Sequence, residues 1–125
     1  MSALFPFHGG LKTIRHKTES NQTPIQAGIL PPRLTVPLRQ HIGAIAKPLV
    51  HPGDQVLKGQ MIGQPDGYIS AAIHAPTSGV VSAVDQQPVP HPSGLSDLCV
   101  TIESDGEERW MDREPVDYRR LHPSE

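Results

Sequence analysis

The sequence predicts an all-β fold, either a sandwich or a small barrel built from short strands. Apolar and polar residues alternate in several short runs between positions 34 and 103, a spacing that turns one face of each strand toward a core. Turn-forming residues separate these runs, and the 125-residue chain contains 14 prolines and 11 glycines. Because proline interrupts helices, this density excludes a long helical bundle.

Residues 1–33 are expected to form an extended N-terminal arm that lies against the folded body. The stretch 18–24 is polar and is typical of a loop. Pro31 and Pro32 prevent a helix nearby, since proline lacks an N–H group and restricts the residue before it.

Residues 34–106 are expected to form the folded domain. The run 34–38 alternates but contains Pro37, which favours an edge strand because proline cannot donate to a sheet ladder. The runs 69–75 and 98–102 alternate without interruption, and each predicts a half-buried strand.

A weak internal repeat connects two parts of this domain at an offset of 24 residues. The segments 49–56 and 73–80 each contain an apolar residue, a proline turn and an apolar return, with Pro52 and Pro76 in equivalent places. Two such units suit a sandwich with pseudo-two-fold symmetry, in which each half covers the apolar face of the other.

Composition and charge exclude several classes of function. The net charge is −2 and the isoelectric point is near 6.4, which gives no basic footprint for nucleic acid. No apolar run reaches the ~18 residues of a membrane span, and no secretory signal precedes the domain. We therefore expect a cytoplasmic chain without direct membrane insertion.

The sequence offers no catalytic, cofactor-binding or metal-binding residues. The chain has seven histidines but none at the spacing of a zinc site. Ser78 lies in a turn without a nucleophile elbow. The lone Cys99 cannot form an internal disulfide or hold an iron–sulfur cluster, and its place in an alternating strand favours a packed thiol. Residues 107–125 are charged and are expected to form a linker.

Two turn motifs resemble the biotinyl/lipoyl-carrier fold. They are Gly-Asp-x-Val-x-x-Gly-Gln at 53–60 and Ala-Pro-x-x-Gly at 75–79. In carriers, the hairpin between these motifs presents a modified lysine. Here no lysine lies between Gln60 and Ala75, and the expected tip carries Tyr68 instead. The resemblance therefore implies the fold without the carrier function.

A second resemblance covers nearly the whole chain. The sequence is similar to the N-terminal domain of the C subunit of the Rnf electron-transport complex, a barrel-sandwich hybrid, and also to the A subunit of sodium-translocating NADH:quinone reductase. The residues that carry this resemblance occur in order: 7–10, Lys17, 24–25, 40–43, 56–60, 69–71, 74–79 and 91–94. A lysine-less binding module of biotinyl/lipoyl type remains a further alternative.

The Rnf resemblance implies a larger parent protein. In it, a flavin- and NADH-binding domain with FMN and a ferredoxin-like domain with two [4Fe–4S] clusters follow this region. The parent is a peripheral subunit on the cytoplasmic face of the bacterial inner membrane and joins electron flow to ion transport. The expected partners are the downstream domains and the other Rnf subunits. Tyr68, Phe5 and Phe7 are candidate docking residues, because aromatic side chains suit interfaces.

Overall fold

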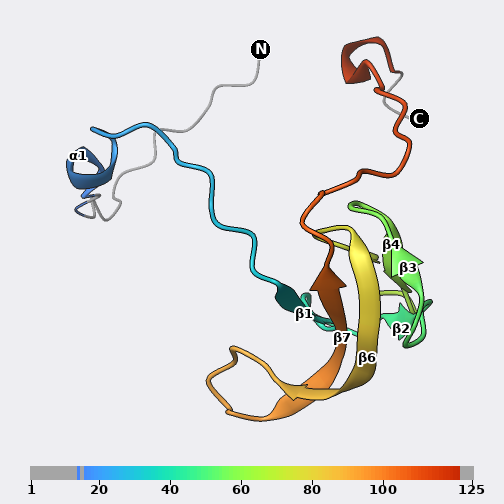
Figure 1. Cartoon of the computed structure of the whole chain (residues 1–125). Helices are drawn as coiled ribbons and strands as arrows, with labels where there is room; N and C mark the ends of the chain where they lie inside the picture. Colours follow the sequence, from blue (N-terminus) through green and yellow to red (C-terminus); the bar gives the residue numbers. More distant parts are fainter. Residues whose placement is uncertain (1–13, 15, 122–125) are drawn as a thin grey trace, which may run out of the picture.

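The computed structural model describes residue 14 and residues 16–121. Its elements, in chain order, are α1 (Lys17–Ser20), β1 (Arg33–Pro37), β2 (Lys47–Pro48), β3 (Gln55–Val56), β4 (Met61–Gln64), β5 (Ile73–His74), β6 (Gly79–Pro88), β7 (Ser96–Ser104) and the 3₁₀ turn η1 (Tyr118–Arg120). The strands form two antiparallel sheets, in the orders β1-β7-β6-β3 and β2-β4-β5, which curl around each other (Figure 1). The predicted all-β class is confirmed.

The long β6–β7 hairpin forms the frame of the larger sheet. Its strands pair from Gly79 opposite Ser104 at one end to Pro88 opposite Ser96 at the other. Strand β1 adds to the outer side of β7 and lies at the edge of the sheet. This confirms the predicted edge strand, where Pro37 needs no ladder partner on its free side.

The internal repeat appears in the pairing of β3 with β6. Gln55 lies opposite Val80, and Val56 lies opposite Gly79. Adding 24 to 55 gives 79, and subtracting 24 from 80 gives 56. Exchanging the two repeat units therefore converts the first pair into the second, as a two-fold axis between the strands requires. Strand β2 ends immediately before the first repeat unit, strand β5 begins the second, and the two flank β4 on opposite sides. The repeat therefore describes real symmetry in the fold.

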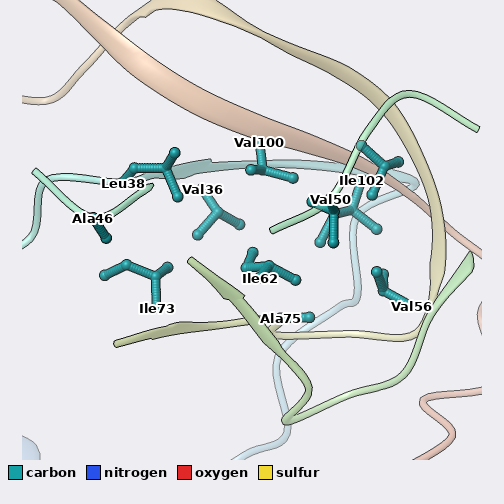
Figure 2. Close-up of a cluster of buried hydrophobic side chains, with 11 residues drawn as sticks. Val36, Leu38, Ala46, Val50, Val56, Ile62, Ile73, Ala75, Val100 and Ile102 are labelled. Atoms are coloured by element: carbon teal, nitrogen blue, oxygen red, sulfur yellow. The ribbon is translucent and has the colours of Figure 1, made fainter. Parts of the chain in front are cut away.

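The core lies between the two sheets and consists of short aliphatic side chains (Figure 2). Both sheets and the connections between them contribute to it. Its buried members are Val36, Leu38, Ala46, Val50, Val56, Ile62, Ile73, Ala75, Val81, Val100 and Ile102. Burial of these side chains supplies the main hydrophobic stabilisation of the fold.

The predicted strand at 69–75 is wrong over most of its length, since only β5 is regular. The backbone before β5 bonds to a neighbouring loop instead of a strand. The N–H of Ala44 donates to the carbonyl of Ile69 at 3.0 Å, and the N–H of Ala71 donates to His41 at 3.1 Å. These bonds satisfy backbone polar groups of the segment without a β-ladder, and the side chain of Ile69 remains 58% exposed.

The N-terminal arm also differs from expectation in its described part. Residues 16–29 are all exposed, and Figure 1 shows the chain before β1 running away from the barrel. The stretch 18–24 is polar and has no continuous apolar face with which to cover the barrel. Phe5 and Phe7 lie outside the described residues.

Candidate functional site

The first candidate surface is the tip, which we define as residues 41–44 and 65–71. A turn with Gly67 at φ +84° leads into Tyr68, whose side chain is fully exposed at 102%. Ile42, on the adjoining loop, is 89% exposed. The two loops are in close contact, because a Cβ on Gly43 would lie 2.1 Å from the carbonyl oxygen of Ile69. The tip thus presents an aromatic and apolar surface, and it has no lysine for a prosthetic group.

His41 joins the two loops of the tip. Its Nε2 lies 3.1 Å from the backbone N–H of Ala71 and 3.0 Å from the carbonyl oxygen of Ala44. Nδ1 is buried and has no partner among the described residues. The hydroxyl of Ser70, 3.2 Å from Nε2, donates to the carbonyl of Ala44 at 3.0 Å. This bonding joins the two loops of the tip to each other, whereas a carrier needs a freely presented hairpin.

A second group of residues lies at the opposite end of the smaller sheet, around Ser78. Ser78 is completely buried, and its hydroxyl donates to Asp105 Oδ1 at 2.8 Å. The same hydroxyl oxygen accepts the backbone N–H of Arg109 at 2.7 Å. The Arg109 guanidinium donates a hydrogen bond to Asp105 Oδ2 at 2.8 Å. We call Ser78, Asp105 and Arg109 the clamp, because together they hold the chain that leaves β7.

The clamp strongly favours the ionised form of Asp105. Its pKa is lowered to about 2, first because the Arg109 side chain donates to the carboxylate, and then because the N–H of Glu107 and the hydroxyl of Ser78 donate to it. Hydrogen bonds to a charged carboxylate stabilise that form. The same pair raises the pKa of Arg109. The clamp therefore contains a hydrogen-bonded ion pair between Asp105 and Arg109.

Beyond the clamp, the chain docks on the turn between β3 and β4. The N–H of Lys58 donates to the carbonyl of Arg109 at 2.8 Å, and the N–H of Met111 donates to the carbonyl of Lys58 at 3.1 Å. The Trp110 ring covers Gly59, where a Cβ would lie 3.1 Å from the indole. The guanidinium of Arg113 stacks 3.7 Å from the ring centroid, a cation–π contact.

Sequence reasoning missed the clamp and the docked segment. It treated Ser78 as an ordinary turn residue and 107–125 as a charged linker throughout. The partners of Ser78 lie 27 and 31 residues away, so no local pattern connects them. The one signal in the sequence was the composition of the turn between β5 and β6, where two hydroxyl residues, Thr77 and Ser78, precede Gly79.

Cys99 and His91 both have local partners or surroundings that the structure defines. Cys99 is completely buried, and burial raises the pKa of its thiol, so the predicted packed thiol is confirmed. His91 bonds to the hydroxyl of Ser93 at 2.8 Å within its own loop. Within residues 14 and 16–121, no three His, Cys, Asp or Glu side chains gather as metal ligands. Over the same range, no helix has the length and apolar character to cross a membrane.

Comparison with known proteins decides the family. Residues 5–107 match the family model of the RnfC barrel sandwich hybrid domain. The chain belongs to this family. The two sheets and the curled architecture described above agree with its name, so the barrel-sandwich hybrid fold expected from the sequence is confirmed.

Similar RnfC-type chains occur in several bacteria. The C subunit of the ion-translocating oxidoreductase complex of Pseudomonas aeruginosa is 52% identical over 124 residues, which are 98% of this chain and 16% of the relative. The Vibrio cholerae protein of the same name is 44% identical over 121 residues, 96% of this chain and 16% of the relative. The Serratia proteamaculans protein is 44% identical over 123 residues, which are 98% of this chain and 17% of the relative. The chain thus spans about one sixth of their length.

Proposed function

We propose that this chain is the non-catalytic N-terminal domain of the C subunit of an ion-translocating oxidoreductase complex. The observation that carries the proposal is the match of residues 5–107 to the RnfC domain, together with relatives that bear the name of this subunit. The relatives' name also favours this assignment over the A subunit of sodium-translocating NADH:quinone reductase and over an independent biotinyl/lipoyl-like module.

In this proposal the redox chemistry belongs to the chain that follows. FMN, the NADH site and two [4Fe–4S] clusters lie in downstream flavin and ferredoxin-like domains, on the cytoplasmic face of the inner membrane. The composition of this domain supports the division, since a cubane cluster requires about four thiolates and the chain has one cysteine. The partners are those domains and the other subunits of the complex.

Within that assembly, we assign a contact role to the tip. Tyr68 combines full exposure with an apolar ring and a polar hydroxyl, which suits a protein interface. Its loop is bonded to the adjoining loop of the tip by His41, which restricts the loop and lowers the conformational entropy lost on binding. Phe5 and Phe7 are candidates for the same role.

Two experiments test the assignment, one on the isolated chain and one on the complete subunit. The isolated chain should be colourless, should have the intact mass of its unmodified sequence and should not oxidise NADH. Deleting this domain from the complete subunit should reduce its recovery in the purified complex, while the remaining subunit keeps its flavin and iron. Flavin bound to the isolated chain, or normal complex assembly without the domain, would contradict the proposal.

Substitution of Tyr68 tests the tip. Tyr68→Ala should leave the melting temperature of the isolated chain nearly unchanged and should weaken assembly of the complete subunit by ~2 kcal/mol, as expected of an anchor residue. The matched control is Leu95→Ala, a change at another exposed position. A large loss of stability with normal assembly would make Tyr68 a structural residue.

A further inference from the structure

The N-terminal arm belongs to the matched family domain although its described part does not pack on the barrel. The family model begins at residue 5, 28 residues before β1 begins at Arg33. Among the described residues, no hydrogen bond connects 22–31 to the barrel. A segment that is part of the family domain and has no role in its core is a candidate for an external partner.

The arm has the features of a linear binding segment. Ile25 and Ile29 are exposed at 102% and 97%. In an extended chain, residues separated by an even number of positions face the same side, so these two isoleucines and Ala27 form one apolar edge. Pro24 and the Pro31-Pro32 pair flank this edge and restrict the free segment, which lowers the entropy lost on binding.

The position of the arm indicates its partner. The N–H of Ser104, the last residue of β7, donates to the carbonyl of Pro32 at 2.8 Å. The next residue, Asp105, is the start of the clamped tail. The arm therefore enters and the tail leaves at the same end of the barrel, opposite the β6–β7 loop (Figure 1).

We propose that residues 22–32 bind the polypeptide that follows the tail in the complete subunit, with Ile25 and Ile29 in an apolar groove of that downstream region. This inference rests on the proposed function, in which about five sixths of the subunit lies beyond this chain, as in its relatives. An extended segment of this length reaches up to ~36 Å from Pro32. The clamp holds the start of the tail at Asp105, next to Ser104, which bonds to Pro32.

Hydrogen exchange of the arm amides, measured by mass spectrometry, tests the proposal. In the isolated 125-residue chain, amides of residues 25–30 should exchange at the rate of an unstructured peptide. In the complete subunit they should exchange at least ~10-fold more slowly, because bound segments open rarely. The double variant Ile25→Ser/Ile29→Ser should restore fast exchange in the arm and leave protection of β6 and β7 unchanged.

The control variant is Leu95→Ser, which changes an exposed leucine at the opposite end of the barrel and should keep the arm protected. Equal, fast exchange in the isolated chain and the complete subunit would overturn the proposal. Protection that appears only in the assembled complex would also overturn it, in favour of another subunit. Flavin and iron content of the same samples reports separately on the proposed function, since an arm can stay unprotected in a protein that carries both.

Discussion

The two repeat-related turns of the barrel have the same place in the fold but different surroundings. The first turn, 51–54, connects β2 to β3, and all four of its residues are exposed. The second turn, 75–79, connects β5 to β6, and its Thr77 and Ser78 are completely buried. The difference arises because the tail after β7 folds over the second turn alone. One hairpin unit thus remains a simple reversal, while its counterpart anchors the chain that leaves the domain.

Gly53 in the first turn and Gly79, the first residue of β6 after the second turn, also have different surroundings. A Cβ on Gly53 would meet nothing within 4 Å, although its φ of +99° favours glycine. A Cβ on Gly79 would lie 2.0 Å from the carbonyl oxygen of Glu103, on the partner strand β7. Glycine at position 53 allows a left-handed backbone conformation, and glycine at position 79 allows two strands to lie close together.

The largest expected effect on stability follows from the close contact between Gly79 and the backbone of β7. Gly79→Ala should destabilise the chain by about 3 kcal/mol or more, because the backbone of β7 must move to admit a methyl group. Gly53→Ala is the matched control and should cost about 1 kcal/mol from its left-handed conformation alone. Urea unfolding followed by circular dichroism measures both values. Similar losses for the two variants would show that the turns do not differ in packing.

The next largest effect concerns the clamp. Ser78→Ala removes the buried hydroxyl that connects Asp105 with the backbone of Arg109, and it should cost about 2 kcal/mol, as for hydrogen bonds to charged groups. The tail should then leave the β3–β4 turn. Trp110 is the sole tryptophan of the chain, so its emission should shift to longer wavelength. Unchanged emission would show that Trp110 holds the tail without the clamp.

The two turns also show what the sequence can and cannot predict. Alternation and proline-glycine turns predicted the β class, the edge strand with Pro37 and the symmetric units, because these depend on neighbouring residues. The clamp could not be predicted, since it joins turn 75–79 to a tail far along the chain. The segment 69–71 was misjudged for a similar reason: its alternation is that of a strand, but His41 supplies the bonds that a ladder would provide.

Acidification provides a graded test of the clamp. The pKa of Asp105 is about 2 in the folded chain, below its ordinary value of 3.8. Folding therefore favours the carboxylate, and its contribution is complete above about pH 4 and is lost as the pH falls toward 2. Trp110 emission should follow this loss within that interval. Asp105→Asn, which cannot ionise, should have weaker tail binding at neutral pH and a smaller change on acidification; an unchanged acid response would assign the transition to another carboxyl group.

The smallest effect is expected at the first turn. Asp54 Oδ2 accepts the backbone N–H of His51 at 2.8 Å, a bond that resembles the one Ser78 makes with Arg109. Both residues at the first turn are exposed, so water can replace the bond, and Asp54→Ala should cost about 0.5 kcal/mol. Thermal unfolding of Asp54→Ala and Ser78→Ala side by side measures the contrast directly. Equal losses would mean that the first turn depends on its side chain as strongly as the second, and the burial supplied by the tail would no longer explain why Ser78 matters.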